Sequence, residues 1–313
     1  MKVLVTGSNG FVAKNLMVRL GELEGFETVK FSRDTPETQL PDLVSDIDAV
    51  VHLAALLHII NPSPSLQENY LKINVGGTQN VVNAAVREHV QNILYFSTIA
   101  VYGNSAGCVL NEETQPTPKT FYEKSKLDAE RIILSAENAN GQRIGTVLRL
   151  AAVYGSRIKG NYRQLLKALA KGRFIPIGSG QNRRTLIYDK DVANAAVLAL
   201  GHPSAGGKIF NVSDGEFHTI NKIIVAMCAA LNRKSPAFFV PERPARFVAG
   251  LIENLFLIFR RQTPISRAAI DKFTEDMAVD SRRVREELGF REQYSLEAGW
   301  KDTVREMRER GDL

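Results

Sequence analysis

The clearest chemical signal in the sequence is the segment YEKSK, residues 122–126, which places Tyr122 and Lys126 four residues apart. On a helix, residues at this spacing lie on the same face. A phenol has a pKa of about 10, so it is a poor acid-base catalyst at neutral pH unless a neighbouring ammonium favours the phenolate. Lowering that pKa by about three units needs roughly 4 kcal/mol, part of which Lys126 could supply. The same spacing also occurs by chance on surface helices.

A second signal is the glycine spacing in the opening stretch, MKVLVTGSNGFVAKNL. An apolar run, a glycine turn and a helical pattern follow one another, and such a turn aims backbone N–H groups and a helix N-terminus at a phosphate. Gly7 permits a tight turn, Gly10 lets a pyrophosphate approach the backbone, and Ala13 is small enough for close helix packing. The stretch predicts a dinucleotide cradle, with a plain strand-turn-helix as the alternative.

Alternating apolar runs and helical patterns in the first half of the chain must position these residues. Continuous apolar runs predict strands that are buried on both faces, and the segments between them repeat at helical spacing. The predicted strands are KVLVTG, ETVKF, DAVVHLAA, NILYFST and IGTVLRL, and the predicted helices are residues 10–20, 69–88 and 121–137. This alternation predicts an α/β fold with a Rossmann-type, doubly wound parallel sheet.

The second half of the chain has a weaker rhythm. After about residue 155, glycine and proline become frequent, as in GSRIKGN and IPIGSGQN. We therefore expect residues 1–155 to form a nucleotide-binding domain and residues 156–313 to form a smaller C-terminal α/β domain that binds the substrate. A segment near residues 186–213 is expected to return to the first domain.

The composition argues against several other classes of protein. The 313 residues are 44% hydrophobic and 24% charged with a net charge of +6, as in an ordinary soluble globular protein. Basic residues occur in scattered pairs, so we expect no nucleic-acid partner. Cys108 and Cys228 predict neither a disulfide framework nor a metal site. No signal peptide is recognised at the start, and with the low cysteine usage this favours a cytoplasmic protein.

The most apolar stretch is FVAGLIENLFLIF, residues 247–259. It is too short for a membrane span and contains Glu253 and Asn254, so we expect no integral membrane segment. A helix buried on one side is the simplest interpretation. A substrate lid and a face that lies on a membrane surface are the alternatives.

The glycine turn together with VHLAA, FSTIAVYG and YEKSKLDAE resembles the extended branch of the short-chain dehydrogenase/reductase superfamily, the NAD-dependent epimerase/dehydratase family. The resemblance implies that Tyr122 is the acid-base residue and that Thr98 hydrogen-bonds the reacting oxygen. It implies that Lys126 grips the nicotinamide ribose and, with the nicotinamide cation, tunes Tyr122. The cofactor-binding residues that it implies are Gly7, Asn9, Gly10, Phe11, Val12, Leu53, Ala54, Ala55, Asn74, Tyr122 and Lys126.

The end of the second predicted strand bears on which dinucleotide is bound. An acidic residue at this place would bind the ribose hydroxyls of NAD. Here the strand ends KFSRD, so that Ser32 and Arg33 occupy the expected place. Serine and arginine suit a 2′-phosphate, which favours NADP(H). NAD(H) stays possible because a shift of one residue would bring Asp34 into the acidic position.

The second half resembles enzymes that act on nucleotide sugars. Arg184 in NRRTLIYDKDVANA matches the arginine that would clamp the diphosphate, and Asn161 in IKGNY matches a residue against the nucleotide. Thr98 would also contact the sugar. The sequence departs from the frequent NVYGP segment at Ala152, which puts one substrate contact in doubt. We expect a UDP-sugar substrate and a homodimer that pairs through residues 69–88 and 121–137.

Two reactions fit this resemblance, which is strongest to bacterial surface-polysaccharide enzymes. The first is reduction of a UDP-4-keto-6-deoxy-N-acetylhexosamine, in which Tyr122 donates a proton to O4. The second is 4-epimerisation of a UDP-sugar, in which Tyr122 acts as base and tightly held NAD takes the hydride first. Ser32 and Arg33 favour the reductase, because a released NADPH suits net reduction. A non-catalytic NADP-binding sensor is a third, remote alternative.

Overall fold

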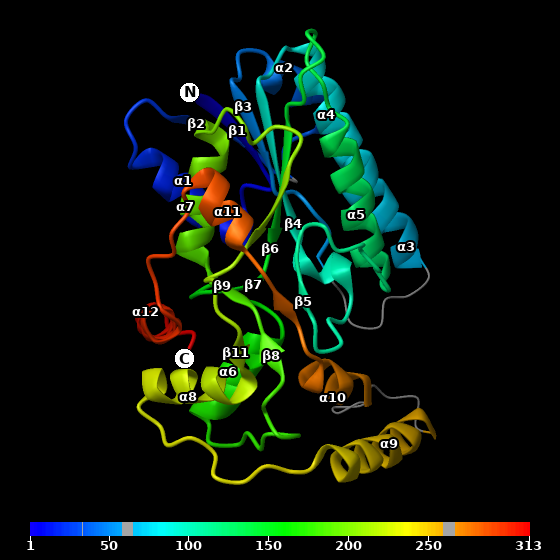
Figure 1. Ribbon diagram of the computed structural model, residues 1–313, viewed down its shortest axis with the longest axis vertical. Helices are drawn as coiled ribbons and strands as arrows, with labels where there is room; N and C mark the ends of the chain where they lie inside the picture. Colours follow the sequence, from blue (N-terminus) through cyan, green and yellow to red (C-terminus); the bar gives the residue numbers. More distant parts are fainter. Residues whose placement is uncertain (33, 58–64, 259–266) are drawn as a thin grey trace.

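Within the residues that the structure describes, 1–32, 34–57, 65–258 and 267–313, six parallel strands form the central sheet of the computed structural model (Figure 1). In spatial order they are β10 (Ile209–Val212), β6 (Gly145–Leu150), β4 (Asn92–Thr98), β3 (Ala49–His52), β1 (Lys2–Thr6) and β2 (Glu27–Phe31). The chain runs outward from β1 to β2 and then crosses to β3 on the other side of β1. The strand order therefore reverses between β1 and β3.

Helices cover both faces of the sheet, and this arrangement explains the continuous apolar strands. Along β1, Val3 and Val5 enter the hydrophobic core beneath α1 and α7, whereas Leu4 points into the core beneath α2, α4 and α5. Each strand must therefore be apolar on both faces. The helices are α1 (Phe11–Gly21), α7 (Asp189–Gly201), α2 (Leu40–Val44), α4 (Gly77–Arg87) and α5 (Phe121–Leu134). The predicted Rossmann-type fold is confirmed.

The helix expected over residues 69–88 differs from the prediction. It consists of α3 (Ser65–Tyr70), a π-helical segment (Leu71–Gly76) and α4, joined without a break. The π segment buries Asn74. Widened turns of this kind are rare and often mark functional positions, because they re-aim one side chain into the protein.

A second hydrophobic core lies below the sheet in the view of Figure 1. It surrounds Trp300, which is fully buried and stacks on Tyr154 with ring centroids 4.6 Å apart. The elements that supply it are β7 (Ala152–Tyr154), β9 (Leu186–Tyr188), α6 (Asn161–Ala170), α8 (Ile220–Leu231) and α12 (Leu296–Glu309). A division into two domains near residue 155 stays a prediction.

The remaining described elements are short or lie at the lower end of the molecule (Figure 1). They are the 3-10 turns Glu37–Gln39 and Ile99–Tyr102, the strands β5 (Val109–Leu110), β8 (Arg183–Arg184), β11 (His218–Thr219) and β12 (Ala278–Val279), and the helices α9 (Glu242–Ile258), α10 (Arg267–Thr274) and α11 (Arg282–Leu288). Of the helices that the structure describes, none combines the length and apolar character needed to cross a bilayer.

Candidate active site

The predicted cofactor residues gather where the strand order reverses. Gly7 follows β1, Ala54 lies just beyond β3, and Thr98 ends β4, the next strand along. In open parallel sheets, ligands bind at the carboxyl ends of the strands at such a switch point. The fold therefore brings the glycine turn and the residues expected around the nicotinamide to one edge of the sheet.

The glycine turn has the tight geometry that its sequence predicts. Gly7 has a φ of +66°, and a Cβ placed on it would lie 2.8 Å from the backbone N and Cα of Ala54. The N–H of Gly10 donates to the carbonyl of Gly7 at 2.8 Å. Gly10 is the N-cap of α1, so the first N–H groups of this helix stand beside the turn, and Ala13 is fully buried against the sheet. The turn can present backbone donors to a pyrophosphate.

The side chains of Phe11 and Val12 are engaged in packing within the protein. Phe11 packs against the core around Trp300, and Val12 packs against the core of the sheet. Their contribution to a dinucleotide would therefore come from backbone N–H groups in the first turn of α1.

The end of β2 brings an acidic side chain to the glycine turn. The carboxylate of Asp34 accepts a hydrogen bond from the Asn9 side-chain amide at 3.3 Å and lies 3.4 Å from the hydroxyl of Ser32. The backbone N–H of Asp34 in turn donates to that hydroxyl at 3.3 Å. Arg33, which the sequence places beside a 2′-phosphate, lies outside the described residues. Of the described side chains at this corner, Asp34 is the one that reaches Asn9.

A buried histidine at the end of β3 joins β1 to the start of α4. The His52 Nδ1 lies 2.7 Å from the hydroxyl of Thr6, and its Nε2 lies 2.9 Å from the hydroxyl of Thr78. Because the Thr78 hydroxyl donates to the carbonyl of Asn74, it accepts from Nε2–H, which leaves Nδ1 as the acceptor. Burial, with a smaller contribution from Lys126, lowers the pKa of His52 to about 3. The ring is therefore a neutral structural link.

Asn74 continues this link to α5, the helix that carries Tyr122 and Lys126. Its amide accepts from Leu56 N–H at 2.6 Å and donates to Leu56 O at 3.2 Å and to Ser125 Oγ at 2.9 Å. Ser125 Oγ donates to the backbone carbonyl of Tyr122 at 2.8 Å. Asn74 is almost fully buried. Asn74 therefore joins the loop after β3 to the start of α5. It would support cofactor binding by holding these two segments in position.

The start of α5 sets the position of Tyr122 and Lys126. Thr120 and Glu123 form a capping box, in which the Thr120 hydroxyl accepts from the Glu123 N–H and the Glu123 carboxylate accepts from the Thr120 N–H. Tyr122 and Lys126 fall on the first turns of the helix, as predicted. This local motif fixes where the helix begins and therefore which face holds the pair.

Lys126 reaches back to β4. Its ammonium donates to the carbonyl of Phe96 at 2.5 Å and lies 4.1 Å from the centre of the Tyr95 ring. The side chain is 3% exposed, and burial lowers the pKa of Lys126 to about 7 even though the carboxylate of Glu130 opposes the shift. The buried ammonium of Lys126 has few contacts among the described residues, so a further polar partner would stabilise its charge.

The surroundings of Tyr122 act against the expectation drawn from the sequence. Burial raises the pKa of Tyr122, and the nearby Tyr70 and Glu123 add to the increase. The rings of Tyr70 and Tyr122 meet edge to face with centroids 6.3 Å apart. The prediction that Lys126, together with a nicotinamide cation, lowers this pKa stays a prediction, because burial dominates in the protein without a cofactor. The phenol of Tyr122 holds its proton.

The hydroxyls of Thr98 and Ser97 make different contacts. Thr98 is half-buried at the end of β4, where its hydroxyl accepts from the N–H of Ala100 at 3.2 Å. Ser97 is buried on the other side of the strand and donates to the carboxylate of Glu130. Thr98 therefore stays the candidate for holding the reacting oxygen, because the hydroxyl of its neighbour Ser97 is bonded to Glu130.

Sequence analysis missed a buried ion pair beneath the site. The guanidinium of Arg149 donates to both carboxylate oxygens of Glu130, with the shortest contact at 2.7 Å, and both side chains are almost fully buried. Glu130 lies one helical turn after Lys126. Its contacts attach the middle of α5 to β4 and β6. Glu130 ends the segment YEKSKLDAE, but its pairing with Arg149 was not predicted, since charged residues on a helix usually face solvent.

Two of the three predicted substrate residues, Asn161 and Arg184, lie in the lower part of the molecule, whereas Thr98 ends β4. Asn161 is exposed at the first position of α6. Arg184 donates to the backbone carbonyls of Lys272 and Phe273 at the end of α10. The charge of Arg184 also acts on Tyr162, the neighbour of Asn161, where it opposes the larger effect of burial that raises the pKa of Tyr162. The α6 start and Arg184 therefore belong to one region.

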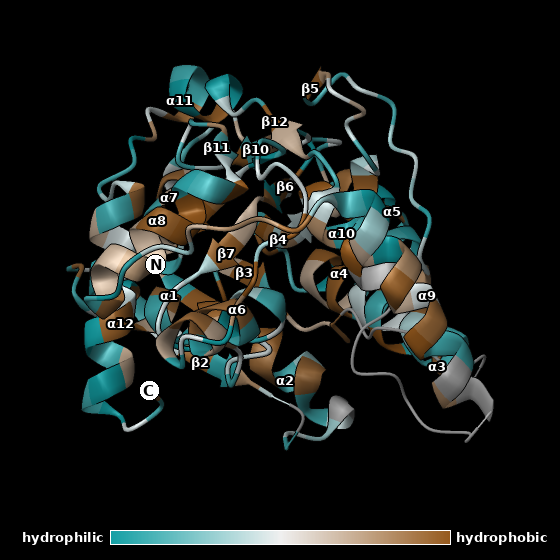
Figure 2. Cartoon of the chain, turned by 90° about the horizontal axis from the view of Figure 1, so that it is seen from below, coloured by the Kyte–Doolittle hydropathy of each residue, from teal (hydrophilic) through white to brown (hydrophobic). Residues whose placement is uncertain are grey.

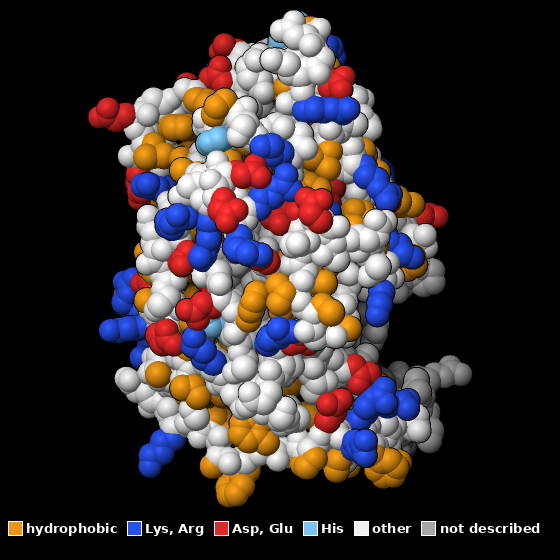
Figure 3. Space-filling view, viewed as in Figure 1, with side chains coloured by type: hydrophobic (Ala, Val, Ile, Leu, Met, Phe, Trp, Pro, Cys, Tyr) orange, Lys and Arg blue, Asp and Glu red, His pale blue; other side chains and the backbone are white. Residues whose placement is uncertain are grey.

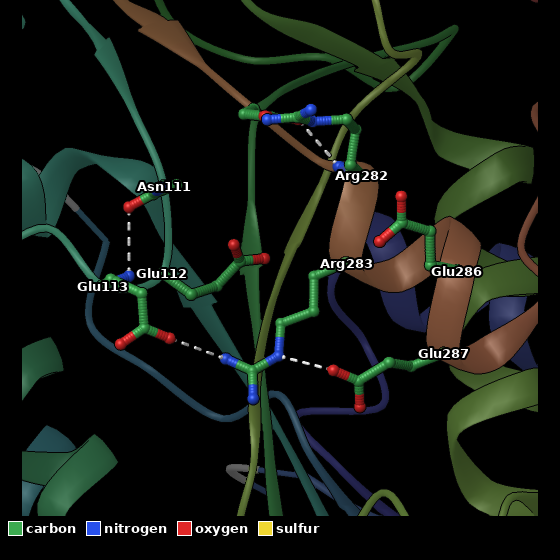
Figure 4. Close-up of a pocket in the computed structure, with 8 residues that line it drawn as sticks. Asn111, Glu112, Glu113, Arg282, Arg283, Glu286 and Glu287 are labelled. Atoms are coloured by element: carbon green, nitrogen blue, oxygen red, sulfur yellow. Dashed lines mark hydrogen bonds and ion pairs between the residues drawn. The ribbon is translucent and has the colours of Figure 1, made fainter.

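A cavity of about 490 Å³ lies between the loop after β5 and α11 (Figure 4). Its charged groups pair with one another: Arg283 Nε donates to Glu287 at 2.9 Å, and Arg283 Nη1 lies 3.4 Å from Glu113. None of the predicted catalytic or cofactor residues lines it. Its acidic lining is also unsuited to a diphosphate.

Known proteins resemble this chain over nearly its whole length. A UDP-glucose 4-epimerase from Vibrio cholerae is 26% identical over 322 aligned residues, which cover 96% of this chain and 94% of the relative. An N-acetyl-alpha-D-glucosaminyl-diphospho-ditrans,octacis-undecaprenol 4-epimerase from Escherichia coli O157:H7 is 29% identical over the same shares of the two chains. A crystal structure of UDP-glucuronic acid 4-epimerase from Bacillus cereus in complex with NAD superposes with a TM-score of 0.78 over 99% of each chain at 20% identity, and supports the fold.

The family assignment rests on a match that spans most of the chain. The profile of the NAD dependent epimerase/dehydratase family matches residues 3–213, from β1 through β10. This range contains the glycine turn, Thr98, Tyr122 and Lys126. The chain is therefore an enzyme of the NAD-dependent epimerase/dehydratase family.

Proposed function

We propose that this enzyme inverts C4 of a sugar held on a diphosphate, as in a UDP-sugar, with NAD that stays bound through the reaction. The observation that carries the proposal is that relatives of 26% and 29% identity, matched over 96% of this chain, are both named as 4-epimerases. The first name describes a sugar carried by UDP, and the second describes a sugar carried by a polyprenyl diphosphate. In both names the sugar is attached to a diphosphate.

The catalytic residues have distinct tasks under this proposal. The phenol of Tyr122 would exchange a proton with the oxygen on C4, and the hydroxyl of Thr98 would hold that oxygen. The chemistry that the dinucleotide supplies when bound is reversible acceptance of the C4 hydride. Lys126, buried beside β4, would hold the nicotinamide ribose, whose hydroxyls offer the partner that its ammonium needs.

The raised pKa of Tyr122 affects its two roles in the catalytic cycle, as acid and as base, in opposite ways. As an acid that returns a proton to O4, a protonated Tyr122 is ready in the protein alone. As a base, it must first lose its proton, and burial opposes that step. The positive charge of an oxidised nicotinamide would favour the phenolate, so the base form would be available only when the hydride acceptor is also in place.

The contacts at the end of β2 support NAD over NADP. The Asp34 carboxylate reaches Asn9 of the glycine turn at 3.3 Å. An acid at this corner accepts hydrogen bonds from the ribose hydroxyls and repels a 2′-phosphate. We therefore propose NAD, against the NADP(H) favoured by Ser32 and Arg33. Asp34→Ser should weaken NAD binding by about tenfold and narrow its advantage over NADP, as measured by fluorescence titration. Asp42→Ser, at an exposed position in the first turn of α2, should change neither affinity.

One incubation separates the epimerase from the reductase. Purified enzyme is mixed with UDP-N-acetylglucosamine or UDP-glucose without added dinucleotide, and the C4 epimers are separated by chromatography. We expect interconversion without net change at the absorbance band of reduced nicotinamide. Consumption of NADPH that requires a UDP-4-keto-6-deoxy sugar, with no interconversion, would replace the epimerase with the reductase. Bound dinucleotide without turnover on any of these sugars would favour the sensor.

Two further expectations remain proposals. We infer that the chain forms a homodimer through α4 and α5, and the exposed Leu71 and Ile73 in the adjoining π segment provide apolar surface for it. We also infer that residues 156–313, apart from a segment near 186–213 that returns to the first domain, bind the sugar diphosphate. Arg184 would be the cation that meets it.

A further inference from the structure

Several large apolar side chains are exposed at the lower end of the molecule. Phe238 is 85% exposed and Phe247 is 69% exposed. Phe239 and, on α9, Val248 and Leu251 extend the same surface. Ile175 is exposed on the chain segment that pairs through Ile177 with Val240. We refer to these six side chains, Ile175, Phe238, Phe239, Phe247, Val248 and Leu251, as the apolar end.

Three side chains of the apolar end lie on the outer face of α9, whose inner face is packed within the protein. Ala249 of α9 is buried, and α9 packs on α10. Two ion pairs hold the helices together: Arg246 with Asp271 and Arg267 with Glu253, each at 2.7 Å. Phe247, Val248 and Leu251 fall on one side of the helix, since they are one and four residues apart. Their exposure is therefore separate from the packing of α9.

Positive charge is concentrated in the same part of the chain. The described residues 232–258 and 267–274 contain six Lys and Arg against three Asp and Glu, so they carry three of the six net positive charges of the protein. Arg243 and Arg246 lie near the start of α9, and both are exposed. In the space-filling view, hydrophobic side chains gather at this lower end beside Lys and Arg side chains (Figure 3). Seen from below, α9 runs along the outside with hydrophobic turns (Figure 2).

We propose that the apolar end binds the surface of an anionic lipid bilayer, with α9 lying in the headgroup layer. Exposed Phe and Leu side chains next to Arg are the combination that partitions into this layer, because the rings enter the acyl boundary while the cations meet the lipid phosphates. An apolar partner without anionic groups would supply no counterion for the exposed Arg243, whereas anionic headgroups supply one. The bilayer satisfies both the apolar and the charged components.

Binding in this orientation would also place the substrate side of the enzyme near the lipid. Arg184, the expected diphosphate cation, contacts the carbonyls of Lys272 and Phe273 at the end of α10, the helix on which α9 rests. This consequence rests on the proposed function. The membrane surface itself does not, because it depends only on the exposed side chains and the charge.

The test is sedimentation of the full-length protein with phosphatidylcholine vesicles, with and without phosphatidylglycerol. We expect binding to the anionic vesicles only, and weaker binding at high salt. Phe238→Ser with Phe247→Ser should reduce vesicle partitioning at least tenfold, as expected for the loss of two buried rings. Arg243→Gln should reduce it about fivefold, as expected for one cation near an anionic surface.

Matched variants elsewhere control for general effects. Val18→Ser removes a residue that is 62% exposed on α1, and Lys171→Gln removes an exposed cation after α6. Both should bind vesicles like the unchanged protein, and all variants should keep its thermal midpoint. Absence of anionic-vesicle binding by the unchanged protein, or equal binding by the Phe and Val18 variants, would overturn the proposal. Self-association abolished by the Phe variants, without vesicle binding, would instead assign the apolar end to a second copy.

Discussion

Replacing Lys126 with methionine should stabilise the fold while it abolishes activity. Lys126 is 3% exposed, and burial lowers its pKa from an ordinary value of 10.5 to about 7. Each pKa unit corresponds to about 1.4 kcal/mol, so keeping this lysine charged costs the folded state about 3 to 5 kcal/mol. Methionine has similar length and no charge, so Lys126→Met removes that cost and leaves little change in packing.

The pH dependence identifies the source of the gain. Because the pKa of Lys126 is lower in the folded state, the unfolded chain binds more protons between pH 7 and 10.5, and the unchanged protein becomes more stable as pH rises across this range. The advantage of Lys126→Met should be greatest at pH 7 and below, shrink by about 1.4 kcal/mol per pH unit above it, and disappear near the unfolded pKa.

Urea denaturation at several pH values, followed by circular dichroism, measures this difference. Lys124→Met provides the control, since Lys124 is an exposed neighbour on the same helix and its replacement should give no comparable pH-dependent gain. A Lys126→Met protein that is less stable at pH 7, or a gain that does not change with pH, would refute the assignment of Lys126 as a strained buried cation.

Two other substitutions test the glycine turn and the support beneath the site. Gly7→Ala should weaken NAD binding at least tenfold in calorimetric titration, because its Cβ would meet the backbone of Ala54 at 2.8 Å, whereas Gly21→Ala, which meets nothing within 4 Å, should bind normally. Glu130→Gln should lower the free energy of unfolding by about 3 to 5 kcal/mol in urea, because it leaves Arg149 buried beside a neutral partner. Glu309→Gln breaks an exposed pair and should cost less than about 1 kcal/mol; equal losses for the two glutamates would contradict the account of the buried pair.

The sheet and the placement of Tyr122 and Lys126 on one helix were predictable because their signals are local. Val3, Leu4 and Val5 are consecutive and apolar since β1 is covered on both faces, and this leaves a direct trace in the sequence. The glycine turn and the start of α5 are likewise set by residues a few positions apart.

The features that were missed depend on residues far apart in the chain. The π segment buries Asn74 so that its amide reaches Leu56 and Ser125, which lie 18 and 51 residues away. Glu130 meets Arg149 across α5 and β6, although each alone resembles a surface charge. The raised pKa of Tyr122 arises from burial by the whole site, which spacing to Lys126 does not reveal.

The central claim is that the Tyr122 hydroxyl moves the proton as the hydride leaves and returns to the sugar. The direct measurement compares Tyr122→Phe with the unchanged enzyme for interconversion of UDP-N-acetylglucosamine and its C4 epimer, after calorimetry has shown that both bind NAD. We predict that Tyr122→Phe retains NAD binding and loses turnover by about 100-fold or more. Full turnover by a Tyr122→Phe protein that binds NAD would contradict the account.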